Sequence, residues 1–288
     1  MEGASFTAEI AIENQSKFKY QIITGYPTIF NYTDEIKNNA ENIRKNLKDN
    51  GAETIICVLD ENSLNDSRWH SGHEIQRENY TFIINELLSN KKLGVIFKPK
   101  VANSLRKRLG KYSDLLEKAL KTKRCFVYED VEDLNNSKPK INKTSPAHAA
   151  LSADLVIHSH LSAGTAAIEC ALIGKPTLLI DRENAVDSIF NKILPNEKII
   201  FNDWPAVIKA INNNYFTKDK KIEDFGKWDK YLNKFDSFCD NGGATRIGDF
   251  LDDLIQGFNN KLNKEEVLEN AVKNYSNTWG KKFVIKKN

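Results

Sequence analysis

The sequence predicts a doubly wound α/β fold, with a parallel sheet of about six strands and helices on both faces. Short apolar segments alternate along the chain with longer segments of helical periodicity. The apolar segments are continuous rather than interrupted by polar residues, which is typical of parallel strands buried on both faces. The chain has 288 residues, of which 40% are hydrophobic, and this is enough to form a substantial core.

In the first half of the chain, turn-forming residues separate the expected elements. Gly25 and Pro27 follow the first strand, Gly51 ends the first helix, and Pro99 ends the third strand. The expected strands in this half are residues 19–24, 53–60, 93–100 and 125–130. The expected helices are residues 34–49, residues 74–88 and a basic stretch that continues to residue 121.

The second half repeats this order with shorter connections. Pro146 suits the first turn of a short helix, while Gly174 and Pro176 stop the next helix before another strand. The expected strands are residues 154–160, 176–181 and 198–201. The expected helices are residues 145–152, 162–173, 204–213, 226–235, 245–258 and 264–275. In an open sheet of this kind, the ligand lies beyond the carboxyl ends of the strands.

Composition and charge exclude several classes of protein. The 42 basic and 39 acidic residues are interspersed, so we expect no nucleic-acid partner. No apolar run approaches the roughly 18 residues of a membrane span, and the first residues do not read as a signal peptide. The 4 cysteines form no Cys-x-x-Cys pair, so neither a zinc ribbon nor a disulfide framework is expected. We therefore expect a cytoplasmic protein, with peripheral attachment to the inner membrane as the alternative.

The strand expected at residues 154–160 has the most polar residues at its carboxyl end. It is followed by a turn and a helix that carry Ser162, Gly164 and Thr165. Small residues at a helix start leave backbone amide groups accessible, and the helix dipole favours an anion there, so we predict a phosphate site. Glu169 lies one turn after Thr165, roughly 5 to 6 Å along the helix, about the distance from a nucleotide phosphate to its ribose. A carboxylate there can accept hydrogen bonds from both ribose hydroxyls. The alternative is an ordinary helix cap with a surface glutamate.

Other strand ends supply further candidates. Lys98 is better placed than Lys100 to bind a phosphate, and the alternative is a solvated strand end. His158 and His160 are two residues apart in an expected strand, so alternation places them on one face. We predict these two histidines as the catalytic residues, with a capping role as the alternative.

A polar loop and a helix start supply contacts of a third kind. His70 and His73 lie in a Trp- and His-containing loop, where they are predicted to contact a ligand. Two histidines three residues apart, without a third ligand, do not predict a metal site. Arg246 follows a Gly-Gly pair at a helix start and could reach an anion, although an exposed helical arginine is commoner. The chain contains no Gly-x-Ser-x-Gly, P-loop or Gly-x-Gly-x-x-Gly motif, which disfavours hydrolases, NTPases and dinucleotide enzymes.

Residues 153–181, ADLVIHSHLSAGTAAIECALIGKPTLLID, resemble the nucleotide-sugar motif of GT-B glycosyltransferases and of the related UDP-GlcNAc 2-epimerases. The resemblance implies that Ser162, Gly164 and Thr165 bind the donor phosphate. It also implies that Glu169 binds the donor ribose. The expected fold is then a Rossmann-like sheet that forms one half of a GT-B enzyme.

Three shorter segments extend the resemblance. TGYP at residues 24–27, VIFKPK at residues 95–100 and FDSFCDNGGATRIGDFL at residues 235–251 are similar to bacterial capsule and surface-polysaccharide glycosyltransferases. The resemblance implies a metal-independent enzyme that moves a sugar from a CMP- or UDP-sugar donor to a glycan or glycolipid acceptor. The nucleotide-sugar is a substrate, so no cofactor and no metal ion are expected. A 2-epimerase-like isomerase and a non-catalytic nucleotide-sugar-binding subunit are the alternatives.

The chain departs from the resemblance in its domain organisation. A complete GT-B enzyme has two Rossmann-like domains, whereas we expect one here, over residues 51–260. Residues 1–50 are expected to be a remnant or edge of the second lobe, and residues 261–288 a C-terminal helix and tail. The second domain is expected to have been cut away, to be a separate chain, or to be absent.

Overall fold

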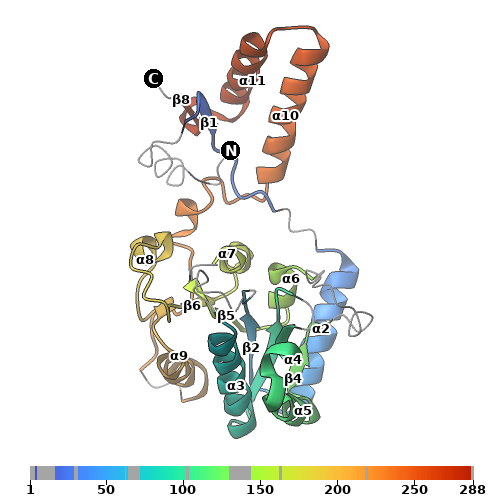
Figure 1. The fold of residues 1–288 in the computed structure, drawn as a ribbon, viewed down its shortest axis with the longest axis vertical. Helices are drawn as coiled ribbons and strands as arrows, with labels where there is room; N and C mark the ends of the chain where they lie inside the picture. The colour runs from blue at the N-terminus through green and yellow to red at the C-terminus, as the bar shows by residue number, and fades with distance from the viewer. Residues whose placement is uncertain are drawn as a thin grey trace. The chain divides into compact units, whose positions relative to one another are not determined.

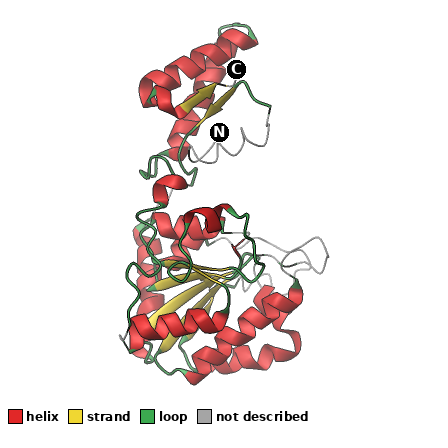
Figure 2. Ribbon diagram, turned by 90° about the vertical axis from the view of Figure 1, so that its left-hand side faces the viewer, coloured by secondary structure: helices red, strands yellow, loops and turns green. Residues whose placement is uncertain are grey.

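The chain forms two compact units, shown in Figures 1 and 2. The computed structural model describes Ala4, Ser63 and residues 17–28, 32–61, 72–101, 104–129, 144–161, 164–217 and 220–286. The sheet unit is Tyr32–Asp229, and the hairpin unit combines Met1–Asn31 with Lys230–Asn288. Two of the predicted site residues, His70 and Ser162, lie outside the described residues.

The sheet unit contains a six-stranded sheet in the order β4-β3-β2-β5-β6-β7, and every neighbouring pair is parallel. Counted from β2, this is the order 3-2-1-4-5-6 of the Rossmann fold, so the predicted fold class is confirmed. The strands are β2 (Thr54–Leu59), β3 (Leu93–Lys98), β4 (Cys125–Val127), β5 (Leu155–His158), β6 (Thr177–Ile180) and β7 (Ile200–Phe201).

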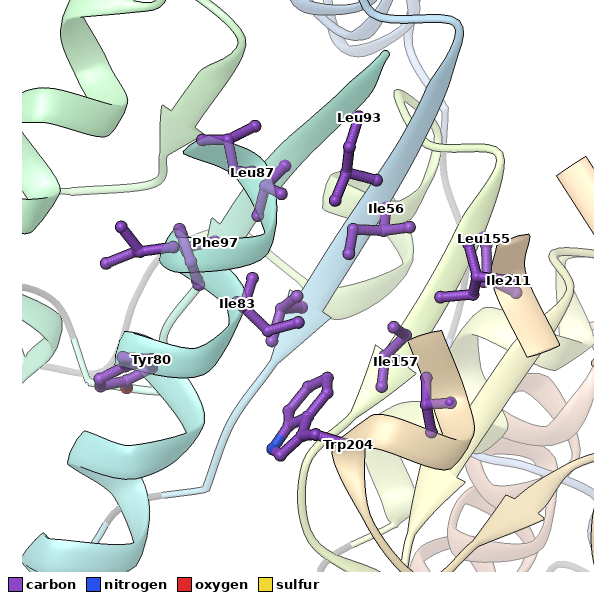
Figure 3. Close-up of a cluster of buried hydrophobic side chains, with 14 of the residues drawn as sticks. Ile56, Tyr80, Ile83, Leu87, Leu93, Phe97, Leu155, Ile157, Trp204 and Ile211 are labelled. Carbon is purple, nitrogen blue, oxygen red and sulfur yellow. The ribbon is translucent and has the colours of Figure 1, made fainter. Parts of the chain in front are cut away.

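Helices cover both faces of this sheet (Figure 2). The α3 face buries the larger core cluster, which includes Ile56, Phe97, Ile157 and Trp204 (Figure 3). Its helices are α3 (His73–Ser89), α4 (Ser104–Leu109), α5 (Ser113–Lys121) and α9 (Trp204–Ile211). The α7 face is covered by α2 (Asp34–Asp49), α6 (Pro146–Ala150) and α7 (Thr165–Leu172). A short helix, α8 (Ile189–Ile193), joins β6 to β7. Short 3-10 or π segments are Gly110–Tyr112, Asn212–Phe216, Leu232–Lys234 and Lys281–Phe283.

The boundaries of the two units differ from the predicted domain boundaries at residues 50 and 260. Helix α2 begins at the Thr33 cap, whose side chain accepts a hydrogen bond from the backbone amide of Ile36. Its buried Ile43 and Leu47 pack with Ile55 of β2 on the α7 face. The apolar stripe of α2 therefore ties this helix to the sheet unit rather than to a separate N-terminal segment.

The hairpin unit is built from both ends of the described chain. Strand β1 (Tyr20–Ile22) pairs antiparallel with β8 (Val284–Lys286) and forms a separate two-stranded sheet. Two helices, α10 (Gly243–Asn259) and α11 (Lys264–Trp279), lie side by side and share a small core (Figure 1). An Asn263–Glu266 capping box begins α11. Of the helices in the described part of the chain, none combines the length and apolar character needed to cross a membrane.

The helix expected over residues 226–235 is wrong. Turns and a single 3-10 segment occupy this stretch, because Asp224 and Gly226 adopt φ angles of +58° and +70°. The backbone of Gly226 is instead used to extend the sheet. Its carbonyl accepts a hydrogen bond of 2.7 Å from the amide of Thr177, and its own amide donates to Lys198 at 3.0 Å.

Candidate functional site

The strand order places the candidate site where β2 and β5 lie side by side. From these two strands the chain leaves to opposite faces, to α3 after β2 and to α7 after β5, which is the switch point where open α/β sheets bind ligands. Leu59, at the end of β2, pairs in register with Lys98 on one side and His158 on the other. Leu59 belongs to the α7-face core, so register places Lys98 and His158 on that face, with Cα atoms roughly 10 Å apart.

Lys98 is a buried cation at the end of β3, with 6% of its surface exposed. Its ammonium makes no hydrogen bond or ion pair with any residue that the structure describes. Burial lowers the pKa of Lys98, while the carboxylates of Asp60 and Glu169 act in the opposite direction. A buried, unpaired ammonium is costly in the folded protein, and an anionic ligand would remove that cost.

Glu169 and Thr165 lie one turn apart on α7, as the spacing predicts. Glu169 is half-buried, and burial raises its pKa while the charge of Lys98 opposes the rise. The charges of Lys98 and Glu169 therefore interact electrostatically. Thr165 is exposed in the first turn of α7, whereas the amides of Ala167 and Ile168 in this turn donate to the carbonyl oxygen of Gly164 at 2.9 and 3.2 Å.

Gly164 is the N-cap of α7, and no side-chain hydrogen bond caps this helix. A Cβ atom at Gly164 would lie 2.8 Å from two ring carbons of Phe190, on α8. The absent side chain therefore lets the helix start pack against an aromatic ring. A bulky residue here would disturb this packing as well as any ligand, so loss of binding alone would not identify a phosphate site.

Two N-cap glycines of the sheet unit allow a matched test of this packing. We expect Gly164→Ser to lower the free energy of unfolding by about 1 to 3 kcal/mol, because the new atoms meet Phe190. Gly72→Ser, at the N-cap of α3, enters open space and should leave stability unchanged or slightly raised, since serine is a good cap. Urea unfolding of both variants measures the difference. Equal stabilities would contradict the close contact at Gly164.

Asp60 follows β2 but is already held by the protein. One carboxylate oxygen accepts a hydrogen bond from the hydroxyl of Tyr80, and the other accepts one of 2.6 Å from the amide of Lys100. Burial raises the pKa of Asp60, and the Tyr80 hydrogen bond counteracts this. Asp60 thus joins the loops after β2 and β3 and adds negative charge beside Lys98.

His158 ends β5 and is buried, with 1% of its surface exposed. Its ring Nδ1 lies 2.7 Å from the carbonyl oxygen of His160 and 3.3 Å from the backbone amide of the same residue. The shorter contact is to an oxygen that can only accept, so it favours a proton on Nδ1. Burial and the neighbouring His160 lower the pKa of His158 to about 3, so the ring is neutral near pH 7. Nε2 then holds a lone pair, and no described residue donates a hydrogen bond to it. A neutral imidazole with an unused lone pair can receive a proton.

The low pKa of His158 predicts a loss of stability in acid. The unfolded chain binds a proton near pH 6.5, whereas the folded protein does so only near pH 3, so stability falls as the pH drops between these values. The slope approaches about 1.4 kcal/mol per pH unit from this group alone. His158→Asn, whose amide can still donate to the His160 carbonyl, should flatten the slope in urea titrations at several pH values. An unchanged slope would show that His158 does not titrate as its burial requires.

His160 is held on the α3 face instead. Its Nε2 lies 2.7 Å from the side-chain oxygen of Gln76 on α3, and its Nδ1 lies 3.2 Å from a carboxylate oxygen of Glu183. Strand β5 ends at His158, so the alternation that predicts a shared face for both histidines stops there. His160 contacts α3, while His158 follows Val156 of the α7-face core. Both ring nitrogens of His160 are used within the protein.

His73 is the first residue of α3 and belongs to a separate polar cluster. Its Nδ1 lies 2.9 Å from the hydroxyl of Ser63, and Arg108 donates to the carbonyl oxygen of Ser63 at 2.9 Å. Burial lowers the pKa of His73, and the charges of Arg108 and Arg77 lower it further. The described residues contain no group of three or more histidine, cysteine or acidic side chains that could hold a metal ion.

Arg246 is a buried residue of the hairpin unit, with 2% of its surface exposed. It pairs with Asp240 and donates to the carbonyl oxygen of Thr24 at 3.2 Å. Its guanidinium carbon lies 3.5 Å from the ring centre of Phe238 and 4.6 Å from that of Trp279. Groups of the hairpin unit therefore hold this side chain on several sides.

The structure adds one side chain that the sequence analysis did not select. Burial raises the pKa of Tyr32 to about 12, and electrostatic interactions with Cys170 and Glu169 contribute to the rise. Its ring meets His148 edge-on, with centres 5.6 Å apart. Tyr32 belongs to no recognisable sequence motif. The one feature of the sequence that could have pointed to it is its position just before Thr33, the N-cap of α2.

The chain matches no family model and no curated protein. It is similar to a solved structure from Listeria monocytogenes assigned as a UDP-N-acetylglucosamine 2-epimerase, with 12% identity and a TM-score of 0.49 over 89% of this chain and 58% of that one. It is also similar to the N-terminal domain of Candida albicans trehalose-6-phosphate phosphatase, with 15% identity and a TM-score of 0.43 over 77% and 46%. The chain thus spans less than two thirds of either structure. At these scores, neither likeness assigns an activity.

Proposed function

We propose that the sheet unit binds the nucleotide-sugar donor of a glycosyltransferase. The observation that carries this proposal is the buried ammonium of Lys98 at the switch point, which has no hydrogen bond or ion pair among the described residues. A cation in this position would favour an anion, and a bound phosphate or diphosphate group would also interact with the start of α7. Glu169, one turn further along α7, would accept hydrogen bonds from the donor ribose.

The proposed reaction breaks the bond between the anomeric carbon of the sugar and the donor phosphate oxygen. The nucleotide leaves with the electron pair, and the acceptor hydroxyl oxygen forms the new bond to the sugar. Lys98 and the amide groups at the start of α7 would stabilise the charge on the departing phosphate. His158 would receive the hydroxyl proton at Nε2. The charge of a bound phosphate would raise the low pKa of His158 toward the working range.

The acceptor side of the reaction is also part of the proposal. A surface glycan or glycolipid would be the acceptor, with the enzyme in the cytoplasm or attached at the inner membrane. In this proposal His70 and His73 contact the acceptor or the sugar. The same role for Arg246 stays a prediction from the sequence, and its guanidinium is held by groups of the hairpin unit. A second Rossmann-like lobe, on a partner chain or elsewhere in a longer protein, would close the site.

Calorimetric titration with CMP, UDP and GDP tests the nucleotide part of this proposal. We expect one of them to bind with a dissociation constant below about 1 mM. This corresponds to a favourable binding free energy of more than about 4 kcal/mol. Absence of binding for all three would contradict the proposal. If a nucleotide binds, incubation with its sugar conjugate separates the alternatives: release of free nucleotide supports transfer, epimerised sugar on an intact conjugate supports an isomerase, and neither supports a binding subunit.

Glu169→Ala should weaken nucleotide binding by about 1.5 to 3 kcal/mol, the range for hydrogen bonds to a charged group. The fold should survive, because Glu169 is only half-buried. Glu53→Ala is the control, since Glu53 is an exposed carboxylate before β2 that pairs with Lys92. Calorimetry on both variants, together with their melting temperatures, gives the comparison. An unchanged affinity in Glu169→Ala would remove this residue from the site.

A further inference from the structure

The α3 face carries a buried hydrogen-bond network beneath the strand ends. Asn79 accepts hydrogen bonds of 2.8 Å from both Trp204 and Arg182 through its side-chain oxygen, and its amide donates to Gln76 at 3.4 Å. Gln76 and Asn79 are 1% and 2% exposed. The network joins α3 and α9 to the loops that follow β2, β5 and β6.

Gln76 has a single orientation that satisfies its neighbours. Its side-chain amide donates to the carbonyl oxygen of Glu61 at 3.1 Å and to the hydroxyl of Tyr80 at 3.2 Å. Its side-chain oxygen is therefore the group that faces Nε2 of His160 at 2.7 Å, and Nε2 of His160 must donate. The carboxylate of Glu183 faces the other ring nitrogen of His160, so this ring is held on both edges.

The backbone of His160 carries this constraint to His158. The His160 carbonyl oxygen is the acceptor for Nδ1 of His158, at 2.7 Å. A carbonyl oxygen cannot donate, so its position fixes the proton of His158 on Nδ1 and leaves the lone pair on Nε2. If the backbone of His160 follows a shift of its ring, the carbonyl oxygen moves away from Nδ1 of His158, and the proton of His158 is no longer held on Nδ1.

We propose that Gln76 is a positioning residue that sets the tautomer of His158 through His160. The proposal rests on the proposed function only for the use of the Nε2 lone pair. The tautomer itself exists without any ligand, and it can be measured without one.

Nitrogen-15 NMR of the full chain, with the His158 signals assigned by a His158→Asn variant, tests the proposal directly. In the wild-type protein we expect a proton on Nδ1 of His158 and a proton on Nε2 of His160. A wild-type His158 protonated on Nε2, or a His160 without a proton on Nε2, would overturn the proposal, whatever the variants do.

Gln76→Met removes the acceptor while keeping the length of the side chain. We expect loss of the Nδ1–H signal of His158 and a shift of its proton partly or wholly to Nε2. Asn85→Leu is the matched control, an amide replaced by an apolar side chain at an exposed position of the same helix. Gln76→Glu keeps an oxygen for His160 and should retain the wild-type tautomer. A folded Gln76→Met with an unchanged tautomer, or loss of the tautomer in both Gln76 variants, would contradict the role given to Gln76.

Turnover adds a second measurement. If the chain transfers sugar, Gln76→Met should lower kcat by about tenfold or more at unchanged KM for the donor, and Gln76→Glu should restore it. If Gln76→Met changes the tautomer of His158 but the chain binds no nucleotide, the role of Gln76 is supported and the proposed function is contradicted. A tautomer that does not move contradicts the role of Gln76 alone.

Discussion

Lys98→Met is expected to weaken nucleotide binding by about 2 kcal/mol or more, which is at least about 30-fold, and to stabilise the unliganded protein. The ammonium is buried without a partner among the described residues. An anionic ligand would therefore bind favourably to it, and without a ligand its burial lowers the stability of the folded protein. Methionine has a similar length and no charge. Removing the cation should therefore change affinity and stability in opposite directions, a combination that a structural lysine would not produce.

The pH dependence gives the sign of the stability effect. Burial lowers the pKa of Lys98 below its ordinary value of 10.5, so the folded protein holds this proton less tightly than the unfolded chain does. The cost is complete below the lowered pKa and disappears as the pH rises toward 10.5. The advantage of Lys98→Met in urea unfolding should therefore shrink in alkali.

Lys100→Met is the control for these measurements. Lys100 lies two residues further along, is exposed, and pairs with Glu61 at the surface. An exposed ion pair contributes about 0 to 1 kcal/mol, so both effects should be small. If Lys98→Met binds nucleotide as tightly as the wild-type protein, the switch point does not hold the donor phosphate.

Gly243→Ala is expected to destabilise the hairpin unit by about 3 kcal/mol, near the upper end for overpacking. A Cβ atom at this position would lie 2.0 Å from the backbone oxygen of Tyr26, and backbone cannot move aside as a flexible side chain can. Gly248→Ala, on the same helix α10, meets open space and should raise stability by about 0.5 to 1 kcal/mol. Hydrogen exchange of the amides of α10 and α11 measures both. Equal protection in the two variants would contradict the close backbone approach.

The parallel sheet could be predicted from the sequence because each strand is a continuous apolar run with a turn residue behind it. Strands β2 and β3 lie within the segments predicted at residues 53–60 and 93–100, since burial on both faces demands apolar residues at every position. The start of α7 and the position of Glu169 also follow from local spacing. These are features that neighbouring residues determine.

Features that depend on distant segments could not be predicted. The pairing of β1 with β8 joins residues at opposite ends of the chain, and no local pattern specifies that pairing. The opposite placement of His158 and His160 depends on where β5 ends and on Gln76, 84 positions before His160. The burial of Arg246 requires Phe238 and Trp279, which only the folded hairpin unit brings together.

The segments around Gly25 and Gly243 are far apart in the sequence, but both contain a glycine for the same structural purpose. A Cβ at Gly25 would lie 2.9 Å from the carboxylate of Asp236, and Gly25 has a φ of +83°. Both glycines thus permit one backbone crossing within the hairpin unit. The TGYP and NGGATR segments, which the resemblance to polysaccharide enzymes had linked only by similarity, meet at this crossing.

The discontinuous make-up of the hairpin unit has a consequence for protein synthesis. Residues Tyr32–Asp229 form one uninterrupted stretch, so the sheet unit can fold while later residues are still being added by the ribosome. Strand β1 is made early, yet its partner β8 is made more than two hundred residues later. Until β8 is made, β1 has no strand to pair with. During that time its apolar side chains must be shielded from water by other parts of the nascent chain or by a chaperone. Completion of the hairpin unit is therefore expected to follow the folding of the sheet unit, once residues Val284–Lys286 have left the ribosome.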